Sequence, residues 1–142
     1  DIGKKCPQCR QEFYPHISPA IIVRITKGDS ILLVHARNFR GTFYGLVAGF
    51  LEAGETLEEC VHREVMEEVG LHIKNLKYFG SQPWPYPSGV MIGFTAEYES
   101  GNIKLQDEEL NAGAFYTKDN LPEIPRKLSL ARKLIDDWLE KE

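Results

Sequence analysis

The sequence predicts an α/β sandwich, in which helices cover the faces of a mixed β-sheet. Two observations lead to this class. Short apolar segments typical of strands occur in both halves of the chain. A long amphipathic helix pattern separates them at residues 57–69, and a second amphipathic pattern closes the chain at residues 128–139. Strands, one long helix, more strands and a closing helix are the order expected of such a sandwich.

Three strands are expected before the long helix. Residues 20–25, AIIVRI, predict a buried strand, and residues 31–35, ILLVH, predict a second one. The segment KGDS at residues 27–30 predicts a turn, so these two strands are expected to pair as a hairpin. Residues 44–50, YGLVAGF, predict a short strand interrupted by glycine that leads directly towards the helix.

Further strands are expected after the helix. Residues 73–79 and the alternating residues 90–98 each predict a strand, and two short strands are expected at residues 103–105 and 114–116. Between them, residues 81–88, SQPWPYPS, predict an extended loop, because three prolines at alternate positions cannot join a central sheet.

Composition limits the class of protein. A chain of 142 residues with 42% hydrophobic and 27% charged residues fits one globular domain with a real core. The net charge of −4 argues against a protein that holds nucleic acid by bulk electrostatics, although it leaves a local basic patch possible. No apolar run is long enough to span a bilayer, and the first residues lack a secretory hydrophobic region. The expected location is therefore the cytosol, without a membrane partner.

The long helix gathers carboxylates on one face. Thr56 followed by Glu59 is a capping box that predicts its start, and Gly70 predicts its end. Its apolar face repeats every four residues, at Leu57, Val61, Val65 and Val69. Its acidic face carries Glu64, Glu67 and Glu68. Because carboxylates near a helix C-terminus repel one another and face the negative end of the helix dipole, a bound divalent cation is expected. Oxygen ligands of this kind suit Mg²⁺ or Mn²⁺.

Residues 49–71 resemble the signature of the Nudix hydrolases, which cleave nucleoside diphosphates linked to another group. The matching positions are Gly49, Glu55, Arg63, Glu64, Val65, Glu67, Glu68, Gly70 and Leu71. Downstream, SQPWPYPS is similar to the SQPWPFPxS array that marks the NADH pyrophosphatase subfamily, with Tyr86 in place of the usual Phe and Gly89 in place of the final Ser. The resemblance covers essentially the whole chain. It implies a Nudix-type α/β/α sandwich at residues 19–142, preceded by a partial zinc-ribbon segment at residues 1–18.

The resemblance implies hydrolysis of the pyrophosphate bond of NADH, and of NAD⁺, to nicotinamide mononucleotide and AMP. The implied metal ligands are the carbonyl of Ala48 and the carboxylates of Glu64, Glu67, Glu68 and Glu109. Glu67 or Glu68 is expected to take the proton of the attacking water. Arg63 is expected to pair with Glu55 or Glu67 and to hold the geometry of the cluster rather than to contact substrate.

The residues expected to bind substrate come from three segments. Phe50 either stacks on a base of the substrate or ends its strand as a core side chain. The prolines hold Trp84 and Tyr86 rigidly, either to shape a dinucleotide pocket or as part of a surface loop with one aromatic side chain in the core. The full set is Phe50, Ser81, Gln82, Trp84, Tyr86, Ser88 and Ala131.

Other functions stay open at this point. The substrate could be ADP-ribose, a dinucleoside polyphosphate or the NAD cap of RNA. Outside enzymes, the domain could sense nucleotides without turnover, or its CxxC segment could bind nucleic acid. The complete set of glutamates argues against the sensor, and the low isoelectric point argues against nucleic-acid binding as the main function.

The three cysteines do not form a disulfide framework. Cys60 lies on the long helix beside Val61 and is expected to be a buried, inert thiol. Cys6 and Cys9 form a CxxC knuckle, a common half of a zinc ribbon, but tetrahedral zinc needs two more ligands. The subfamily's first CxxC pair is missing, so the chain is either cut within the ribbon or descended from a form that lost this pair, and Asp1, which is not a methionine, favours a trimmed chain. Little zinc is therefore expected on a monomer, and a site shared within a homodimer is the alternative.

Overall fold

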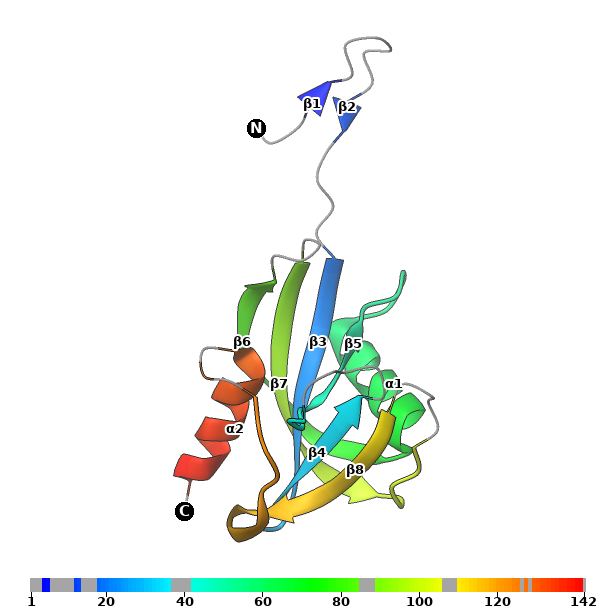
Figure 1. Ribbon diagram of the computed structural model, residues 1–142. Coiled ribbons are helices and arrows are strands. Elements are labelled where there is room, and N and C mark those ends of the chain that lie inside the picture. The colour runs from blue at the N-terminus through cyan, green and yellow to red at the C-terminus, as the bar shows by residue number, and fades with distance from the viewer. Residues whose placement is uncertain are drawn as a thin grey trace.

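A mixed sheet between two helices forms the body of the molecule (Figure 1). The computed structural model describes residues 4–5, 12–13, 18–36, 42–84, 89–105, 110–125, 127 and 129–141. Within them, the six-stranded sheet has the order β6-β7-β3-β4-β8, and β5 pairs with β3 beside this path. A separate two-stranded sheet pairs β1 (Lys4–Lys5) with β2 (Glu12–Phe13).

The sheet is mixed because one of its pairs is parallel. The strands are β3 (Ser18–Lys27), β4 (Ser30–Ala36), β5 (Val47–Phe50), β6 (His72–Trp84), β7 (Gly89–Ser100) and β8 (Leu110–Thr117). β3 and β7 run parallel, and the other pairs are antiparallel. The expected hairpin of β3 and β4 is present, and the first half of β3 pairs with β5, with Ala20 opposite Phe50 and Ile21 opposite Gly49.

Local signals place both helices where the sequence predicts them. α1 (Leu57–Val69) starts with the expected capping box: the amide of Glu59 donates to the hydroxyl of Thr56 at 3.1 Å, and the amide of Thr56 donates to the Glu59 carboxylate at 2.8 Å. It ends at Gly70, whose φ of 72° is the left-handed conformation that glycine adopts without strain. α2 (Leu130–Glu140) starts after the N-cap Ser129, and a short 3₁₀ turn, η1 (Lys118–Asn120), follows β8.

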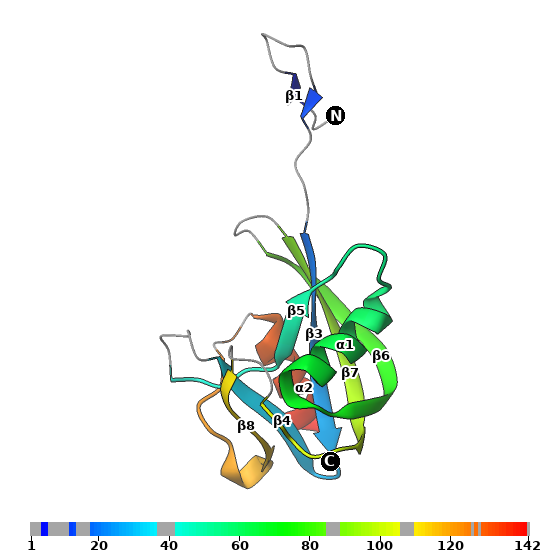
Figure 2. The ribbon, with the colours of Figure 1, turned by 90° about the vertical axis from the view of Figure 1, so that its right-hand side faces the viewer.

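The two helices cover opposite faces of the sheet, as Figure 2 shows. Successive side chains of a strand point to opposite faces. Ile21, Val23 and Ile25 of β3 therefore join the apolar layer under α1, whereas Ile22 joins the layer under α2. The expected apolar face of α1 is confirmed, because Val61, Val65 and Val69 are fully buried and Leu57 packs against the same cluster.

One loop prediction and one strand prediction were wrong. The expected loop at residues 81–88 does not start at Ser81, because β6 continues to Trp84 and pairs with the start of β7. β6 lies at one edge of the sheet, and an edge strand tolerates Pro83 where a central strand would not. Residues 85–88 lie outside the described part of the chain. The expected strand at residues 103–105 is absent, and the amide of Lys104 instead donates to the carbonyl of Val69 at 2.8 Å.

The expected strand at residues 44–50 is shorter than predicted. Only Val47–Phe50 pairs with β3, while Gly45 forms an isolated bridge to Val34 with two backbone hydrogen bonds of 2.8 Å. The segment therefore changes partner from β4 to β3 along its length, and its end delivers Gly49 and Phe50 to the side of α1.

Candidate functional site

The acidic face of α1 carries three carboxylates in different environments. The side chain of Glu67 is 53% exposed and that of Glu64 only 12% exposed. Glu68 is buried, with 5% of the residue exposed, on a helix whose other buried residues are apolar or cysteine. A carboxylate is kept in such a position only where polar groups or a cation compensate for its desolvation.

Arg63 joins this face to the strand before it. Its Nε donates to Glu55 at 2.5 Å, and one terminal nitrogen, Nη2, donates to Glu55 at 2.9 Å and to the carbonyl of Phe50 at 3.0 Å. The other terminal nitrogen, Nη1, donates to Glu64 at 2.7 Å and to Glu67 at 3.1 Å. Both expected partners, Glu55 and Glu67, are therefore in contact with Arg63. The bond to Glu64 was not expected from the sequence.

The pair of Arg63 and Glu55 is fixed in its charged form. The hydrogen bond from Arg63 is the main cause that lowers the pKa of Glu55 from 4.5 to about 2, and the backbone amide of Glu52 adds to it at 3.0 Å. The same bond from Glu55 raises the pKa of Arg63 above its already high value. Because neither group changes its charge near neutral pH, this pair is suited to hold a site rather than to transfer protons.

Gly49 provides the space in which Glu64 lies. A Cβ atom at position 49 would lie 2.1 Å from the carboxyl carbon of Glu64 and within 2.5 Å of both its oxygens. The Glu64 carboxylate is therefore packed directly on the backbone of β5, next to the peptide that carries the Ala48 carbonyl. Here the glycine is required for space and not for its backbone angles, since its φ is not in the left-handed region.

The donor atoms at this place fit a hard divalent cation by type. Glutamate carboxylates and a backbone carbonyl are the ligands that Mg²⁺ and Mn²⁺ prefer. In the described residues, however, no three His, Cys, Asp or Glu side chains converge closely enough to hold a metal ion. The guanidinium of Arg63 engages the carboxylates of both Glu64 and Glu67. Glu109, the further ligand that the resemblance implies, lies outside the described residues.

Two neighbours of the acidic face resolve open alternatives. Phe50 is 61% exposed, so the alternative that it is a core side chain was wrong. Its ring is accessible for stacking. Cys60 is fully buried, and burial, followed by the negative charge of Glu55, raises the pKa of its thiol to about 11. The expected burial of Cys60 is therefore confirmed, and the raised pKa is in line with an unreactive thiol.

The other residues expected to bind substrate lie on β6 and α2. Ser81 is exposed, Gln82 is half-buried, and Ala131 is half-buried in the first turn of α2. The backbone of Trp84 belongs to β6, and nothing is described of its side chain. The structure brings Gln82 and α2 into contact through the amide of Leu130, a partner 48 residues away that no sequence signal indicated. Tyr86, Ser88, Cys6 and Cys9 fall outside the described residues.

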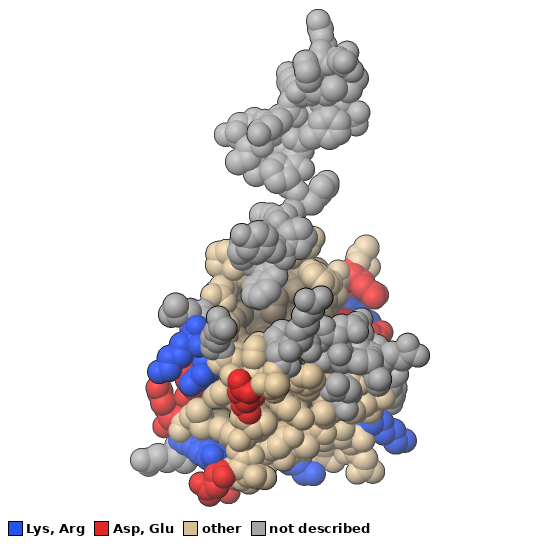
Figure 3. Space-filling view, viewed as in Figure 1, with Lys and Arg blue, Asp and Glu red and all other residues tan. Residues whose placement is uncertain are grey.

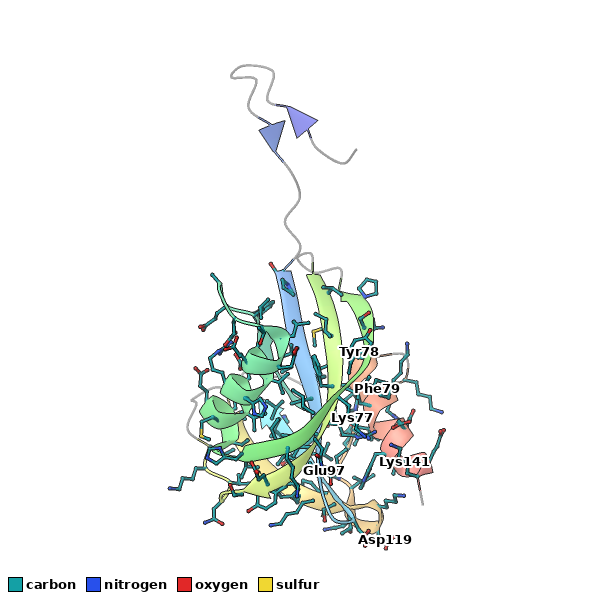
Figure 4. The ribbon with its side chains drawn as sticks, turned by 180° about the vertical axis from the view of Figure 1, so that it is seen from behind. Lys77, Tyr78, Phe79, Glu97, Asp119 and Lys141 are labelled. Atoms are coloured by element: carbon teal, nitrogen blue, oxygen red, sulfur yellow. The ribbon has the colours of Figure 1, made fainter. Side chains whose placement is uncertain are left out.

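A separate polar cavity of about 690 Å³ lies beside the end of α2. Figure 4 labels four of its lining residues, Lys77 of β6, Glu97 of β7, Asp119 of η1 and Lys141 after α2. Its buried arginine, Arg24, is engaged by α2, because one terminal nitrogen donates at 2.8 Å to the carbonyl of Leu134 and to Asp137. Both signs of charge line this cavity and none of the residues predicted to be functional does, so the acidic face of α1 remains the candidate site.

The distribution of surface charge and the length and sequence of the helices indicate whether the molecule has a nucleic-acid surface or a membrane span. On the face shown in Figure 3, the coloured basic and acidic side chains are scattered and do not gather into a basic patch. Among the described residues, no helix has the length and the apolar sequence that a membrane span requires.

The chain is similar over most of its length to curated bacterial proteins. It is 47% identical over 137 residues to the NAD-capped RNA hydrolase NudC of Pseudomonas aeruginosa strain LESB58, which covers 96% of this chain and 49% of that protein. It is 50% identical over 134 residues to the protein of the same name from Pseudomonas syringae pv. syringae, covering 94% and 48% of the two chains. The chain thus spans about half the length of these relatives.

Solved structures resemble the fold. A NUDIX hydrolase from Nitrosomonas europaea superposes with a TM-score of 0.80 at 21% identity, over 96% of this chain and 78% of that one. The NUDIX domain of Shewanella oneidensis NrtR, complexed with ADP ribose, gives 0.71 at 16% identity, over 87% and 90%. A family model described as the NUDIX domain matches residues 15–138. This chain therefore belongs to the Nudix hydrolase superfamily, and within it to the NADH pyrophosphatase-like subfamily.

Proposed function

We propose that this domain hydrolyses the pyrophosphate bond of NADH and NAD⁺, with a divalent cation, to nicotinamide mononucleotide and AMP. The observation that carries the proposal is the seating of the Glu64 carboxylate on Gly49, on the helix that also bears Glu67 and Glu68. The relatives at 47% and 50% identity, named NAD-capped RNA hydrolases, support a substrate that contains NAD.

The proposed cation ligands are Glu64 and Glu68, with the Ala48 carbonyl, Glu67 and Glu109 close by. When bound, Mg²⁺ or Mn²⁺ polarises a phosphoryl oxygen and lowers the pKa of the attacking water. Arg63 then acts as a positioning residue, because it holds Glu64 and Glu67 on one side and Glu55 and the Phe50 carbonyl on the other. Glu67 or Glu68 accepts the proton of the water. The exposure of Glu67 gives that proton a direct route to solvent.

The base of the substrate is proposed to stack on Phe50. Its ring is exposed next to the acidic face, since its own carbonyl accepts from Arg63. Stacking on an aromatic ring tolerates different bases, so Phe50 gives affinity and little discrimination. Discrimination between a dinucleotide and ADP-ribose is assigned to the segment from Ser81 to Ser88, and to Ala131.

The NAD cap of RNA is the second candidate substrate. The printed name of the relatives favours it. The net charge of −4 provides no bulk attraction for the RNA beyond the cap. On this basis, RNA is expected to bind through its cap, with a weak dependence of its affinity on salt.

A panel of substrates tests the proposal. The protein is incubated with Mg²⁺ and equal concentrations of NADH, NAD⁺, ADP-ribose, a dinucleoside polyphosphate and NAD-capped RNA, and the products are separated. Nicotinamide mononucleotide and AMP, formed with the highest kcat/KM from NADH or NAD⁺, support it. Faster cleavage of ADP-ribose or of the polyphosphate contradicts the substrate. Binding without cleavage of any compound indicates a nucleotide sensor.

The proposed assembly is a homodimer, and a monomer of this chain is expected to bind little zinc through Cys6 and Cys9. The proposal rests on the CxxC spacing, which supplies half of a tetrahedral ligand set. Gel filtration followed by elemental analysis measures it. We expect little zinc in a monomer fraction, and about half a zinc per chain in a dimer fraction would indicate a site shared by two chains, since one tetrahedral ion takes four thiolates. Close to one zinc per chain in a monomer contradicts the shared site.

A further inference from the structure

The polar cavity beside the end of α2 lies across the sheet from the acidic face of α1. Successive side chains of β3 point to opposite faces of the sheet, and Val23 and Ile25 join the apolar layer under α1. Arg24 and Thr26, which alternate with them, line the cavity of about 690 Å³ together with Trp138 of α2. The sheet therefore separates this cavity from the carboxylates of α1, and none of the residues expected to bind substrate lines it.

Arg24 supplies a buried charge to this cavity, because only 4% of the residue is exposed. Its hydrogen bonds to α2 come from one terminal nitrogen, Nη1, which donates to the carbonyl of Leu134 and to Asp137 at 2.8 Å. Its Nε has no hydrogen-bond partner among the described residues. Nε and Nη2 form an edge of the guanidinium that can donate to two oxygens of one oxyanion. A buried donor without a partner costs free energy, so an anion that accepts from this edge would relieve that cost.

Three lysines from different elements add positive charge to the lining. They are Lys77 of β6, Lys118 of η1 and Lys141 after α2, and Figure 4 labels the first and the last. The ammonium group of Lys118 donates to the carbonyl of Lys141 and lies 5.7 Å from the centre of the Trp138 ring. A phosphate monoester carries about two negative charges near neutral pH and has more oxygens than a carboxylate. It can therefore accept from a guanidinium and from ammonium groups at the same time.

The cavity does not attract anions by its net charge. Three exposed carboxylates, those of Asp29, Glu97 and Asp119, line it beside the four cationic side chains. The carboxylate of Glu97 is engaged, because the side-chain amide of Asn75 donates to it at 2.7 Å. Exposed charges are screened by water and salt, whereas a buried charge is screened much less. Recognition of an anion here therefore depends on the guanidinium of Arg24 and not on bulk attraction.

We propose that this cavity binds a phosphate group, either inorganic phosphate or a phosphate monoester, through the edge of Arg24 formed by Nε and Nη2. The lysine ammonium groups then accommodate the remaining oxygens. A volume of about 690 Å³ lies within the range of sites for small organic ligands, so the cavity has room for the group esterified to the phosphate. This second site goes beyond the hydrolysis proposed for the acidic face of α1 and does not depend on it.

NMR of the arginine side chain observes the site directly. The protein is kept in EDTA at constant ionic strength and titrated with inorganic phosphate, AMP or acetate, while the Nε–H resonance of Arg24 is followed. Phosphate or AMP is expected to shift this resonance to saturation, and acetate is expected to bind at least about fivefold more weakly, because it has fewer oxygens. Tighter binding of AMP assigns the site to monoesters, and tighter binding of inorganic phosphate assigns it to the free ion.

Two variants that are matched by location test the role of the guanidinium. Arg24→Lys keeps the positive charge and a donor for α2 but removes the edge formed by Nε and Nη2. It is expected to weaken binding of the tighter phosphate ligand about 10- to 100-fold, measured by calorimetry, which corresponds to a charge-assisted hydrogen bond. Lys133→Met is the control, because Lys133 is exposed on α2 and does not line the cavity. Its Kd is expected to stay within about twofold of the wild type.

The outcomes separate this inference from the proposed function. Unchanged affinity for phosphate and AMP in Arg24→Lys overturns the inference, because the anion is then bound elsewhere. An Arg24 resonance that phosphate and AMP do not shift in the wild type also overturns it, and this measurement remains decisive if Arg24→Lys does not fold. Acetate binding as tightly as phosphate contradicts the class of ligand. Failure of NADH hydrolysis contradicts the proposed function and leaves these measurements intact.

Discussion

The carboxylate of Glu64 occupies the space that a side chain at Gly49 would need, with its carboxyl carbon 2.1 Å from the position of a Cβ atom. The two signature residues lie 15 positions apart in sequence, and the position of the Glu64 carboxylate depends on the absence of a side chain at Gly49. The carboxylate of Glu64 on α1 is pressed against the backbone of β5 at Gly49, and Nη1 of Arg63 donates to it at 2.7 Å.

Gly49→Ala is expected to displace the Glu64 carboxylate and to reduce kcat at least about 100-fold, since misplacement by about 1 Å costs this much in a positioned site. The colliding atoms are the end of a flexible side chain, so the free energy of unfolding is expected to change by less than about 1 kcal/mol. Steady-state kinetics and urea unfolding of the same preparation measure both quantities.

The matched control for this variant is Gly45→Ala. A Cβ atom at Gly45 would meet nothing within 4 Å, although the residue lies four positions earlier in the same segment. Activity close to that of the wild type is expected. An equal loss of activity in both variants would show that the effect arises from the flexibility of the segment and not from the contact with Glu64.

Glu68→Gln is expected to lower kcat by at least about 100-fold with a much smaller change in stability, because a ligating carboxylate acts through its charge. Glu64→Gln is expected to behave in the same way. Glu58→Gln, on the exposed side of the same helix, is the control and is expected to be nearly silent. Near-normal turnover by Glu68→Gln would remove this residue from the catalytic cluster. Binding of Mn²⁺, measured by calorimetry, should weaken in Glu68→Gln and not in Glu58→Gln.

The bond between Arg63 and Glu55 predicts a dependence of stability on pH. The pKa of Glu55 is about 2 in the folded protein, against 4.5 ordinarily, so its ionised form is favoured by folding. Its contribution is fully present above about pH 4.5 and is lost as the pH falls towards 2. In the presence of EDTA, the difference in unfolding midpoint between wild type and Glu55→Gln is therefore expected to shrink over this range. A constant difference down to pH 2 would contradict the assignment of the low pKa to Glu55.

Signals that act locally made α1 predictable. The capping box of Thr56 and Glu59, the stop at Gly70 and the repeat of valines all lie within a few turns of each other, and each is found in the structure. The prediction that Pro83 lies in a loop was wrong. The cost of a proline in a strand depends on whether that strand lies at the edge of the sheet, and the order of the strands decides this.

Contacts between distant segments could not be predicted. The exposure of Phe50 depends on how α1 packs on β5, so the sequence left two alternatives that only the fold separates. The bond of Gln82 to Leu130 joins residues 48 positions apart, and no pattern in either segment indicates it. The positions of Glu64 and Glu67 were known from the signature, whereas their bonds to Arg63 required coordinates.

Trp84→Ala is expected to lower kcat/KM for NADH more than for ADP-ribose, because only NADH carries a second base for the ring to contact. Stacking of one base contributes about 1–3 kcal/mol, so the ratio of the two kcat/KM values is expected to change by about tenfold. Tyr78→Ala is the control, since Tyr78 is an exposed aromatic residue on the same strand that packs edge-on against Phe94. Equal losses for both substrates in Trp84→Ala would reduce Trp84 to a structural role.

The ion pair of Arg24 and Asp137 predicts an asymmetry in stability. Arg24 is 4% exposed and its Nε has no hydrogen-bond partner among the described residues, whereas the Asp137 side chain is 38% exposed and also lies 3.5 Å from Lys141. Asp137→Ala leaves a buried guanidinium with the Leu134 carbonyl alone and is expected to cost about 1–3 kcal/mol, a value reduced by the exposure of the aspartate. Arg24→Met removes the buried charge and the unsatisfied donor together, so a cost below about 1 kcal/mol is expected.

Urea unfolding of both variants and of the double variant measures this order, and the double variant is expected to match Arg24→Met. A larger cost for Arg24→Met than for Asp137→Ala would show that the guanidinium stabilises α2 beyond its pairing with Asp137.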